Sequence, residues 1–382
     1  MSRGRRTAAR LAAAMVRASA AGALLRRRRH QRGDFRVFIL EYHDVTNSTR
    51  EPEGVVSATR FRRHLRHLRR HCRLVSLSRA TALLNDPGAL GEDVAAITLD
   101  DGYAGNYDSA FPVLREEQVP AAIFVTTGFL DGTELWFDLA ARCFEAARGD
   151  GRGLAPNLQG DLRMALGQWP FRGSTERAVE QLKLVAPAAR DRLLSELRAA
   201  CAPLTPAARP LRWEQVRKMI AAGIEIGAHT VSHPILSTLS ADEQVREIIG
   251  ARDRITERTH VLPTLFAYPN GGDGDFDAQT VSILQHAGFT AACTTSRGSN
   301  RPGCDLYRLR RIGVGAEPCF VLAARLAGVF DDGVRQRLPR LASIGKRRVR
   351  TEAAVQKAQP SLPAPSPMPG RGGRNEFRPR VR

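Results

Sequence analysis

The sequence predicts an α/β fold and, within that class, a (β/α) barrel. The first observation is a strand–helix–strand unit: the runs VAAITLDD (94–101) and AAIFVTTGFL (121–130) flank a helical pattern at 106–118. Such a short unit implies parallel strands, and largely apolar runs are typical of strands covered on both faces. The second observation is that the candidate polar residues all follow strands, at the ends where barrel active sites are assembled.

The same alternation continues along the chain. Further strands are predicted at 37–45, 223–229, 264–269, 289–295 and 306–314, and further helices at 59–72, 213–222, 240–258 and 276–287. In the first of these helices, apolar residues from Phe61 to Cys72 recur at helical spacing, with arginines on the other face. At least six strands therefore alternate with helices.

The framework is interrupted once and flanked by two basic ends. Residues 131–210 are rich in Ala, Arg and Leu, with helical periodicity at 136–148 and 176–200, which predicts a mostly helical insertion. We expect one catalytic domain at 37–333, a basic amphipathic segment at 1–36, and a basic, Pro-rich, disordered tail at 334–382.

The net charge of +19 belongs to the two ends, whereas the body of the chain is nearly neutral. A nucleic-acid enzyme more often carries its charge on a folded face, so we expect no specific nucleic-acid partner. The basic termini are better interpreted as solvated arms, or as weak contacts to a membrane surface or a polyanion.

The compartment is left open by the N-terminal pattern. Arg17 interrupts the apolar stretch LAAAMVRASAAGALL, and four arginines follow it, which makes a poor signal peptide. We expect a cytoplasmic or membrane-peripheral protein, with export by a poor signal sequence as the alternative. The six cysteines contain no CxxC pattern, which argues against a zinc ribbon or a disulfide framework.

Two motifs at strand ends suggest metal chemistry. TLDDGY ends a buried strand with Asp100 and Asp101, so that one carboxylate can bind a metal while the other acts as a base. HTVSH places His229 and His233 four residues apart, and both imidazoles can reach one ion if the segment turns helically. Each motif alone also has an ordinary interpretation, as a turn or as a chance pair.

Two further strand ends add weaker signals. FAYPNGG (266–272) ends in a loop that can bring backbone N–H groups close to a ligand, although Pro/Gly turns are common. His43 follows the first strand, where a lone histidine is more often a packed residue. Taken singly, neither segment identifies a site.

Taken together, TLDDGY, HTVSH and FAYPNG resemble, in this order, the NodB-type polysaccharide deacetylases of carbohydrate esterase family four. The resemblance covers about 37–315. EYHDV, WEQVRKMIAAGIEIGAHTVSHP and YRLRRIGV resemble the branch linked to bacterial exopolysaccharide and poly-N-acetylglucosamine deacetylation. The resemblance implies a distorted (β/α) barrel and a divalent metal, usually zinc, with Co²⁺ or Ni²⁺ as alternatives.

The resemblance also implies roles for individual residues. Asp101, His229 and His233 match the metal ligands, and Asp100 matches the general base. Tyr268 matches the residue whose backbone N–H helps to hold the oxyanion, and with Pro269, Gly102 and Tyr103 it completes the expected substrate-binding set. The Leu-x-His that supplies the general acid in many members is missing here, and His43 is the expected replacement.

The expected activity is removal of N-acetyl groups from the amino sugars of an acetylated polymer or oligosaccharide, with release of acetate. A carbohydrate O-acetyl esterase on the same scaffold is the main competing hypothesis, because the same zinc–water chemistry cleaves esters. Two further hypotheses are a non-catalytic glycan-binding protein and a nucleic-acid binder that acts through its basic tails. The oligomeric state is left open.

Overall fold

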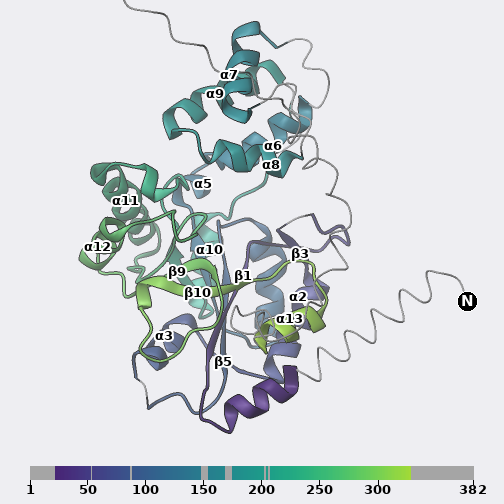
Figure 1. The fold of residues 1–382 in the computed structure, drawn as a ribbon, viewed down its shortest axis with the longest axis vertical. Coiled ribbons are helices and arrows are strands. Elements are labelled where there is room, and N and C mark those ends of the chain that lie inside the picture. The colour runs from purple at the N-terminus through teal and green to yellow at the C-terminus, as the bar shows by residue number, and fades with distance from the viewer. Residues whose placement is uncertain are drawn as a thin grey trace, which may run out of the picture. The chain divides into compact units, whose positions relative to one another are not determined.

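The computed structural model describes residues 22–327, except 53, 87, 148–153, 168–173, 202–203 and 205–206. Its centre is a closed ring of seven parallel strands (Figure 1). In ring order these are β1 (Val37–Tyr42), β5 (Val94–Leu99), β6 (Ala121–Val125), β7 (Glu225–Ala228), β8 (Leu265–Ala267), β9 (Ala291–Arg297) and β10 (Leu309–Gly313). β10 pairs again with β1, which closes the ring. The predicted (β/α) barrel is confirmed.

Helices connect the strands of the ring. They are α2 (Ala58–Arg69), α3 (Leu77–Asn85), α4 (Phe111–Glu116), α5 (Thr127–Leu130), α10 (Trp213–Ala221), α11 (Ala241–Thr259), α12 (Ala278–His286) and α13 (Cys319–Leu326). A π-helix, η1 (Asn106–Ala110), precedes α4, and short turns η2 (Leu236–Thr238) and η3 (Leu306–Arg308) precede α11 and β10. β2 (Asp44–Thr46) pairs with β3 (Val55–Ser57), and β4 (Arg73–Leu74) pairs with the start of β5.

The strands alternate between two apolar layers. In β1, Phe38, Leu40 and Tyr42 pack against the surrounding helices, whereas Val37 and Ile39 belong to a second cluster inside the ring. This period of two is that of a strand covered on both faces. Glu41 continues the inward series of β1, so the interior becomes polar near the carboxyl ends of the strands.

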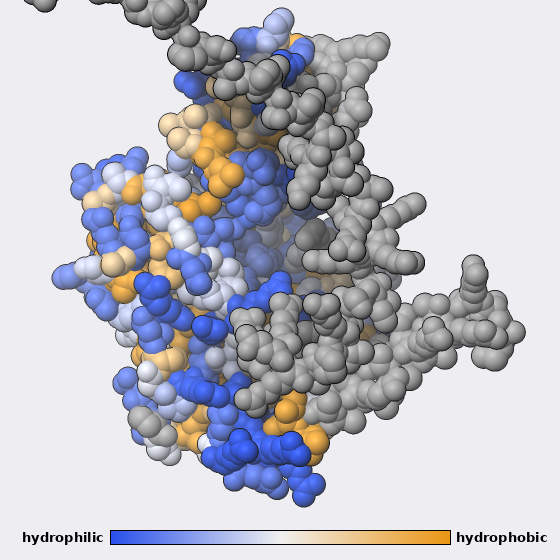
Figure 2. Space-filling view, in the orientation of Figure 1, coloured by the Kyte–Doolittle hydropathy of each residue, from blue (hydrophilic) through white to orange (hydrophobic). Residues whose placement is uncertain are grey.

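The helices of segment 131–210 share an apolar core of their own. They are α6 (Trp136–Ala146), α7 (Pro156–Leu166), α8 (Thr175–Leu182) and α9 (Pro187–Cys201). The helix expected at 176–200 is two helices, because the chain breaks after Leu182 and Pro187 starts α9, where proline is well tolerated. Apolar side chains gather on the surface over these helices (Figure 2), and Met164 and Leu184 are 84% and 82% exposed.

Residues 22–30 form a helix that is anchored to the barrel. Arg29 makes two hydrogen bonds to Asp93, at 2.8 and 2.5 Å, and His30 contacts the same carboxylate at 2.8 Å. Of the basic ends expected to touch a membrane surface or a polyanion, residues 1–21 and 334–382 lie outside the described residues, whereas the four arginines at 26–29 lie in this helix. Among the described helices, none has both the length and the apolar character needed to cross a membrane.

Candidate active site

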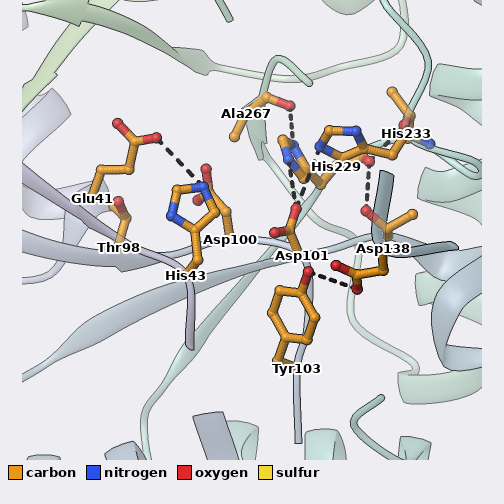
Figure 3. A network of polar contacts seen from close by, with 12 residues as sticks. Glu41, His43, Thr98, Asp100, Asp101, Tyr103, Asp138, His229, His233 and Ala267 are labelled. Carbon is orange, nitrogen blue, oxygen red and sulfur yellow. Dashed lines mark hydrogen bonds and ion pairs between the residues drawn. The ribbon is translucent and has the colours of Figure 1, made fainter. Parts of the chain in front are cut away.

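The candidate polar residues follow three different strands of the ring. Asp100 and Asp101 follow β5, His43 follows β1, and His229 follows β7. Figure 3 shows His43 to one side of the two aspartates, with His229 and His233 to the other. Parallel strands bring their carboxyl ends to one rim, which is why residues far apart in the chain meet here.

Asp101, His229 and His233 form a compact group. The Nε2 atoms of both histidines lie 3.4 Å from Oδ1 of Asp101. The side chains of Asp101 and His229 are almost fully buried, and that of His233 is 11% exposed. No donor within the described residues makes a hydrogen bond to Oδ1 of Asp101. A buried carboxylate oxygen without a donor is costly unless a cation compensates it.

The hydrogen bond made by the His229 ring agrees with a role as a ligand. Its Nδ1 lies 2.7 Å from the carbonyl oxygen of Ala267. A carbonyl only accepts, so Nδ1 carries a proton and Nε2 is the atom that faces Asp101. Burial lowers the pKa of His229, but Asp101 and Asp100 outweigh it and raise that pKa, so a cation bound here would take the place of the Nε2 proton. Burial lowers the pKa of His233 and so favours its neutral form, which is the form that binds metals. Two imidazoles and one carboxylate fit a divalent cation such as zinc.

The HTVSH segment is not helical, which corrects the expected reason for its histidines to meet. Thr230 and His233 adopt left-handed backbone conformations, with φ of 64° and 58°. These two turns bring the imidazoles together, and Glu247 of α11 holds the segment by accepting the N–H groups of Val231 and Ser232 at 2.8 and 2.9 Å. A residue other than glycine in the left-handed backbone conformation costs about 1–2 kcal/mol of folding free energy, and such residues cluster at functional sites.

Asp100 is held by a buried arginine. Arg311, which is fully buried on β10, donates from Nη1 to Oδ1 at 2.8 Å and from Nη2 to Oδ2 at 2.7 Å. Burial alone would raise the pKa of Asp100, but the charges of Arg311 and His229 outweigh it and lower that pKa below its usual value. Asp100 is therefore ionised and fixed in orientation beside the candidate ligands.

His43 lies near a second buried carboxylate. Its Nε2 is 3.9 Å from Oε1 of Glu41, and the Glu41 side chain is 7% exposed. Arg311 Nη2 is 3.4 Å from the same oxygen, so this guanidinium contacts both Glu41 and Asp100. The side chain of His43 is 44% exposed and therefore accessible to a substrate.

The expected role of Tyr268 needs correction. Its backbone N–H donates to the carbonyl of Cys293 at 3.0 Å, within the β8–β9 pairing, so it is not available for an oxyanion. Its hydroxyl donates to the carbonyl of Tyr307 at 2.9 Å. Pro269 has no N–H to offer. The next N–H along the loop is that of Asn270, and it has no hydrogen-bond partner in the described part of the chain.

Gly102 and Tyr103 shape the turn that follows the two aspartates. Gly102 has φ of 89°, a backbone conformation that residues with a Cβ rarely adopt, so glycine is favoured there. Tyr103 then turns inward, and its hydroxyl donates to Asp138 of α6 at 3.0 Å. Burial raises the pKa of Asp138 to about 7.

A cavity of about 330 Å³ lies beside this turn. It is lined by residues 44–47, 103–105, 108–109 and 208–209. Its walls combine the Tyr103 ring with the carboxylates of Asp44 and Asp108 and the guanidinium of Arg209. Burial raises the pKa of Asp44 to about 6. Because the cavity adjoins His43 and the DDGY turn through directly neighbouring residues, it is a candidate place for part of a substrate.

Sequence reasoning missed three residues of this site. Arg311 and Glu41 each stand at an inward position of a strand whose other inward residues are apolar, and a charged residue in such a series is a signal that could have revealed them. Asp138 gave no comparable signal, because the helical pattern around it does not show that α6 reaches the barrel.

The chain is similar in sequence and in fold to known proteins. The family model described as "Polysaccharide deacetylase" matches residues 88–292. The chain is 21% identical over 279 residues to "Putative polysaccharide deacetylase YxkH" of Bacillus subtilis (strain 168), an alignment that covers 72% of this chain and 70% of that protein. It superposes on the structure of IcaB from Ammonifex degensii with a TM-score of 0.51 and 21% identity, over 77% of this chain and 97% of that one, which supports the fold.

Proposed function

The chain belongs to the polysaccharide deacetylase family, and from this premise we propose that it removes N-acetyl groups from the amino sugars of a glycan by metal-dependent hydrolysis. The observation that carries the proposal is the orphaned oxygen of Asp101, which faces the Nε2 atoms of His229 and His233 at 3.4 Å. These three side chains would hold the cation. Zinc suits two imidazoles and one carboxylate best, with Co²⁺ or Ni²⁺ as alternatives.

When bound, zinc would supply a Lewis acid for the acetyl carbonyl and a water of lowered pKa. Asp100 is the base that accepts the proton of the attacking water. The two hydrogen bonds from Arg311 keep this carboxylate ionised and prevent it from rotating away. The base thus has its oxygens fixed before the substrate arrives.

An amine is a poor leaving group, so amide cleavage also requires a proton donor. His43 is the candidate, because its ring is accessible at the same rim and lies close to both Asp100 and Glu41. An ester needs such a donor far less, and the presence of a placed acid therefore favours N-deacetylation over O-deacetylation. The N–H of Asn270 is the candidate donor to the oxyanion, in place of that of Tyr268.

The sugar next to the one that loses its acetyl group would occupy the cavity beside Tyr103. The cavity volume is at the lower end of the range for small-ligand sites. Carboxylate and guanidinium groups on its walls can bind several sugar hydroxyls at once. The family match and the EYHDV and YRLRRIGV motifs favour an acetylated bacterial exopolysaccharide such as poly-N-acetylglucosamine as the polymer.

Acetate release tests this function. The purified, zinc-loaded protein is incubated with N-acetylglucosamine oligomers and, separately, with O-acetylated xylan oligomers. We expect acetate from the N-acetylated set, its loss on chelation, and its return with added zinc. Faster release from the O-acetylated set would establish the esterase hypothesis, and zinc binding without acetate from either set would support a glycan-binding role.

A further inference from the structure

The helical segment 131–210 contacts the active site through three consecutive residues at the start of α6. Trp136 donates from Nε1 to the backbone carbonyl of His233 at 3.0 Å. The Phe137 ring packs edge-on against the His233 imidazole, with ring centroids 4.9 Å apart. Asp138 accepts the hydroxyl of Tyr103. One candidate metal ligand therefore has both its backbone and its ring in contact with a helix that is not part of the barrel.

His233 needs such support because of its backbone. It has a positive φ, which non-glycine residues rarely adopt. Thr230 Oγ1 accepts the His233 N–H at 3.0 Å, which fixes the preceding peptide. The following peptide is fixed by the Trp136 indole. A conformation of this kind persists only where the surrounding structure constrains it from several sides.

The indole of Trp136 is itself fixed by the insertion. Trp136 is 8% exposed and belongs to the apolar core shared by α6 to α9. The guanidinium of Arg190, on α9, lies over its ring at 4.1 Å, and Arg190 is 4% exposed. The direction of the Nε1–H bond is thus set by the packing of the insertion rather than by the barrel.

A second helix of the insertion touches a second loop of the site. Lys183, which follows α8, donates from Nζ to Oδ1 of Asn270 at 2.6 Å. Asn270 also has a positive φ, of 60°. Its loop follows β8 and carries the candidate oxyanion donor. The insertion therefore holds two of the strand-end loops from outside the barrel.

We propose that the insertion is a positioning element of the active site and that Trp136 is the residue through which it holds His233 in the orientation for metal binding. This inference rests on the proposed metal site. It gives residues 131–210 a role in cation affinity, which a merely appended helical segment would not have. Partners that fix the orientation of a metal ligand typically contribute a factor of about 10–100 in affinity.

The test compares zinc affinities, measured by competition with a chromophoric chelator on metal-depleted protein. Trp136→Phe keeps an aromatic ring in the core and removes the N–H donor. We expect zinc affinity to fall by about 10- to 100-fold. Trp213→Phe is the matched control: its Nε1 donates to Asp131 at 2.8 Å, a residue outside the site, so its loss should leave zinc affinity unchanged.

The outcomes separate the inference from the proposed function. If the wild-type protein binds no zinc, the metal site itself is refuted. If the wild-type protein binds zinc and folded Trp136→Phe binds it equally well, the positioning role is refuted. Should Trp136→Phe not fold, Arg190→Met, which keeps the indole but removes the guanidinium that lies over its ring, carries the test, and unchanged zinc affinity in that variant overturns the proposal.

Discussion

Arg311 and Asp100, which are 211 positions apart in the sequence, form a buried, bidentate ion pair with donor–acceptor distances of 2.8 and 2.7 Å. Such paired geometry fixes the carboxylate and favours its ionised form. The pair explains how an aspartate that is 2% exposed can remain ionised, as the proposed base must be. It would also make the proposed activity dependent on a strand far from the DDGY motif.

Arg311→Met should move the acidic limb of the pH–rate profile to higher pH. In the native protein Arg311 holds the pKa of Asp100 down, so removing it raises that pKa, by about 1–3 units, and the base is protonated at a higher pH. The free energy of unfolding should also fall by about 3–5 kcal/mol, because the Asp100 carboxylate would be left buried without its partner. Arg310→Met, an exposed neighbour on the same strand, is the control, and an equal shift in both variants would contradict the role of the pair.

Asp100→Asn should retain stoichiometric zinc and lose activity by about 10²- to 10⁴-fold, the range for general-base catalysis. Asp101→Asn should lose zinc as well, because its oxygen faces both imidazoles. Metal content by mass spectrometry and acetate release measure the two effects. Loss of zinc from Asp100→Asn alone would show that the roles of the two aspartates are exchanged.

His43→Ala should slow amide hydrolysis by about 10²- to 10⁴-fold and hydrolysis of an activated aryl acetate far less, because only the amine needs a proton to leave. Glu41→Gln should also lower the ratio of the amide rate to the aryl acetate rate, but by a smaller factor, since Glu41 is the carboxylate nearest to the His43 ring. The double variant should be no worse than His43→Ala. An equal loss of rate on both substrates would exclude His43 as the general acid.

Variants in the cavity should affect long substrates selectively. Arg209 and Asp108 pair with each other at 3.0 Å on the cavity wall. Arg209→Ala and Asp108→Ala each remove one of these polar groups and should raise KM for an N-acetylglucosamine tetramer by about 3- to 10-fold, the effect of one hydrogen bond. The aryl acetate, which has no second sugar, should be hydrolysed at the native rate. An unchanged KM for the tetramer would place the neighbouring sugar elsewhere.

Asp93→Asn should lower the free energy of unfolding at neutral pH by about 3 kcal/mol, because it breaks a buried pair with Arg29. Arg29 and His30 outweigh burial and hold the folded-state pKa of Asp93 below 3.8. Such a carboxylate stabilises the fold above pH ~4, and this stability is lost as the pH falls through the folded-state pKa. The wild type and Asp93→Asn should therefore differ less in free energy of unfolding at pH 3 than at pH 7, as measured by denaturant unfolding. An equal difference at both pH values would exclude the charge of Asp93 as its cause.

The barrel and its rim could be predicted from local sequence. Apolar runs of strand length that alternate with amphipathic helices leave few topologies open, and parallel strands must present their carboxyl ends together. The motifs TLDDGY and HTVSH stand at those ends. The position of Asp100, Asp101 and His229 at one rim therefore follows from chain order and periodicity.

What the sequence by itself determined is thus which strands form and which residues stand at their ends. The tertiary structure alone decided which partner each of those residues meets: Arg311 for Asp100, Trp136 for His233, and Cys293 for the N–H of Tyr268. Periodicity reports the face on which a side chain lies, whereas these pairings depend on how distant segments pack. A hydrogen bond requires its donor and acceptor to lie about 3 Å apart, so these partners meet only when the whole barrel and the insertion have packed together.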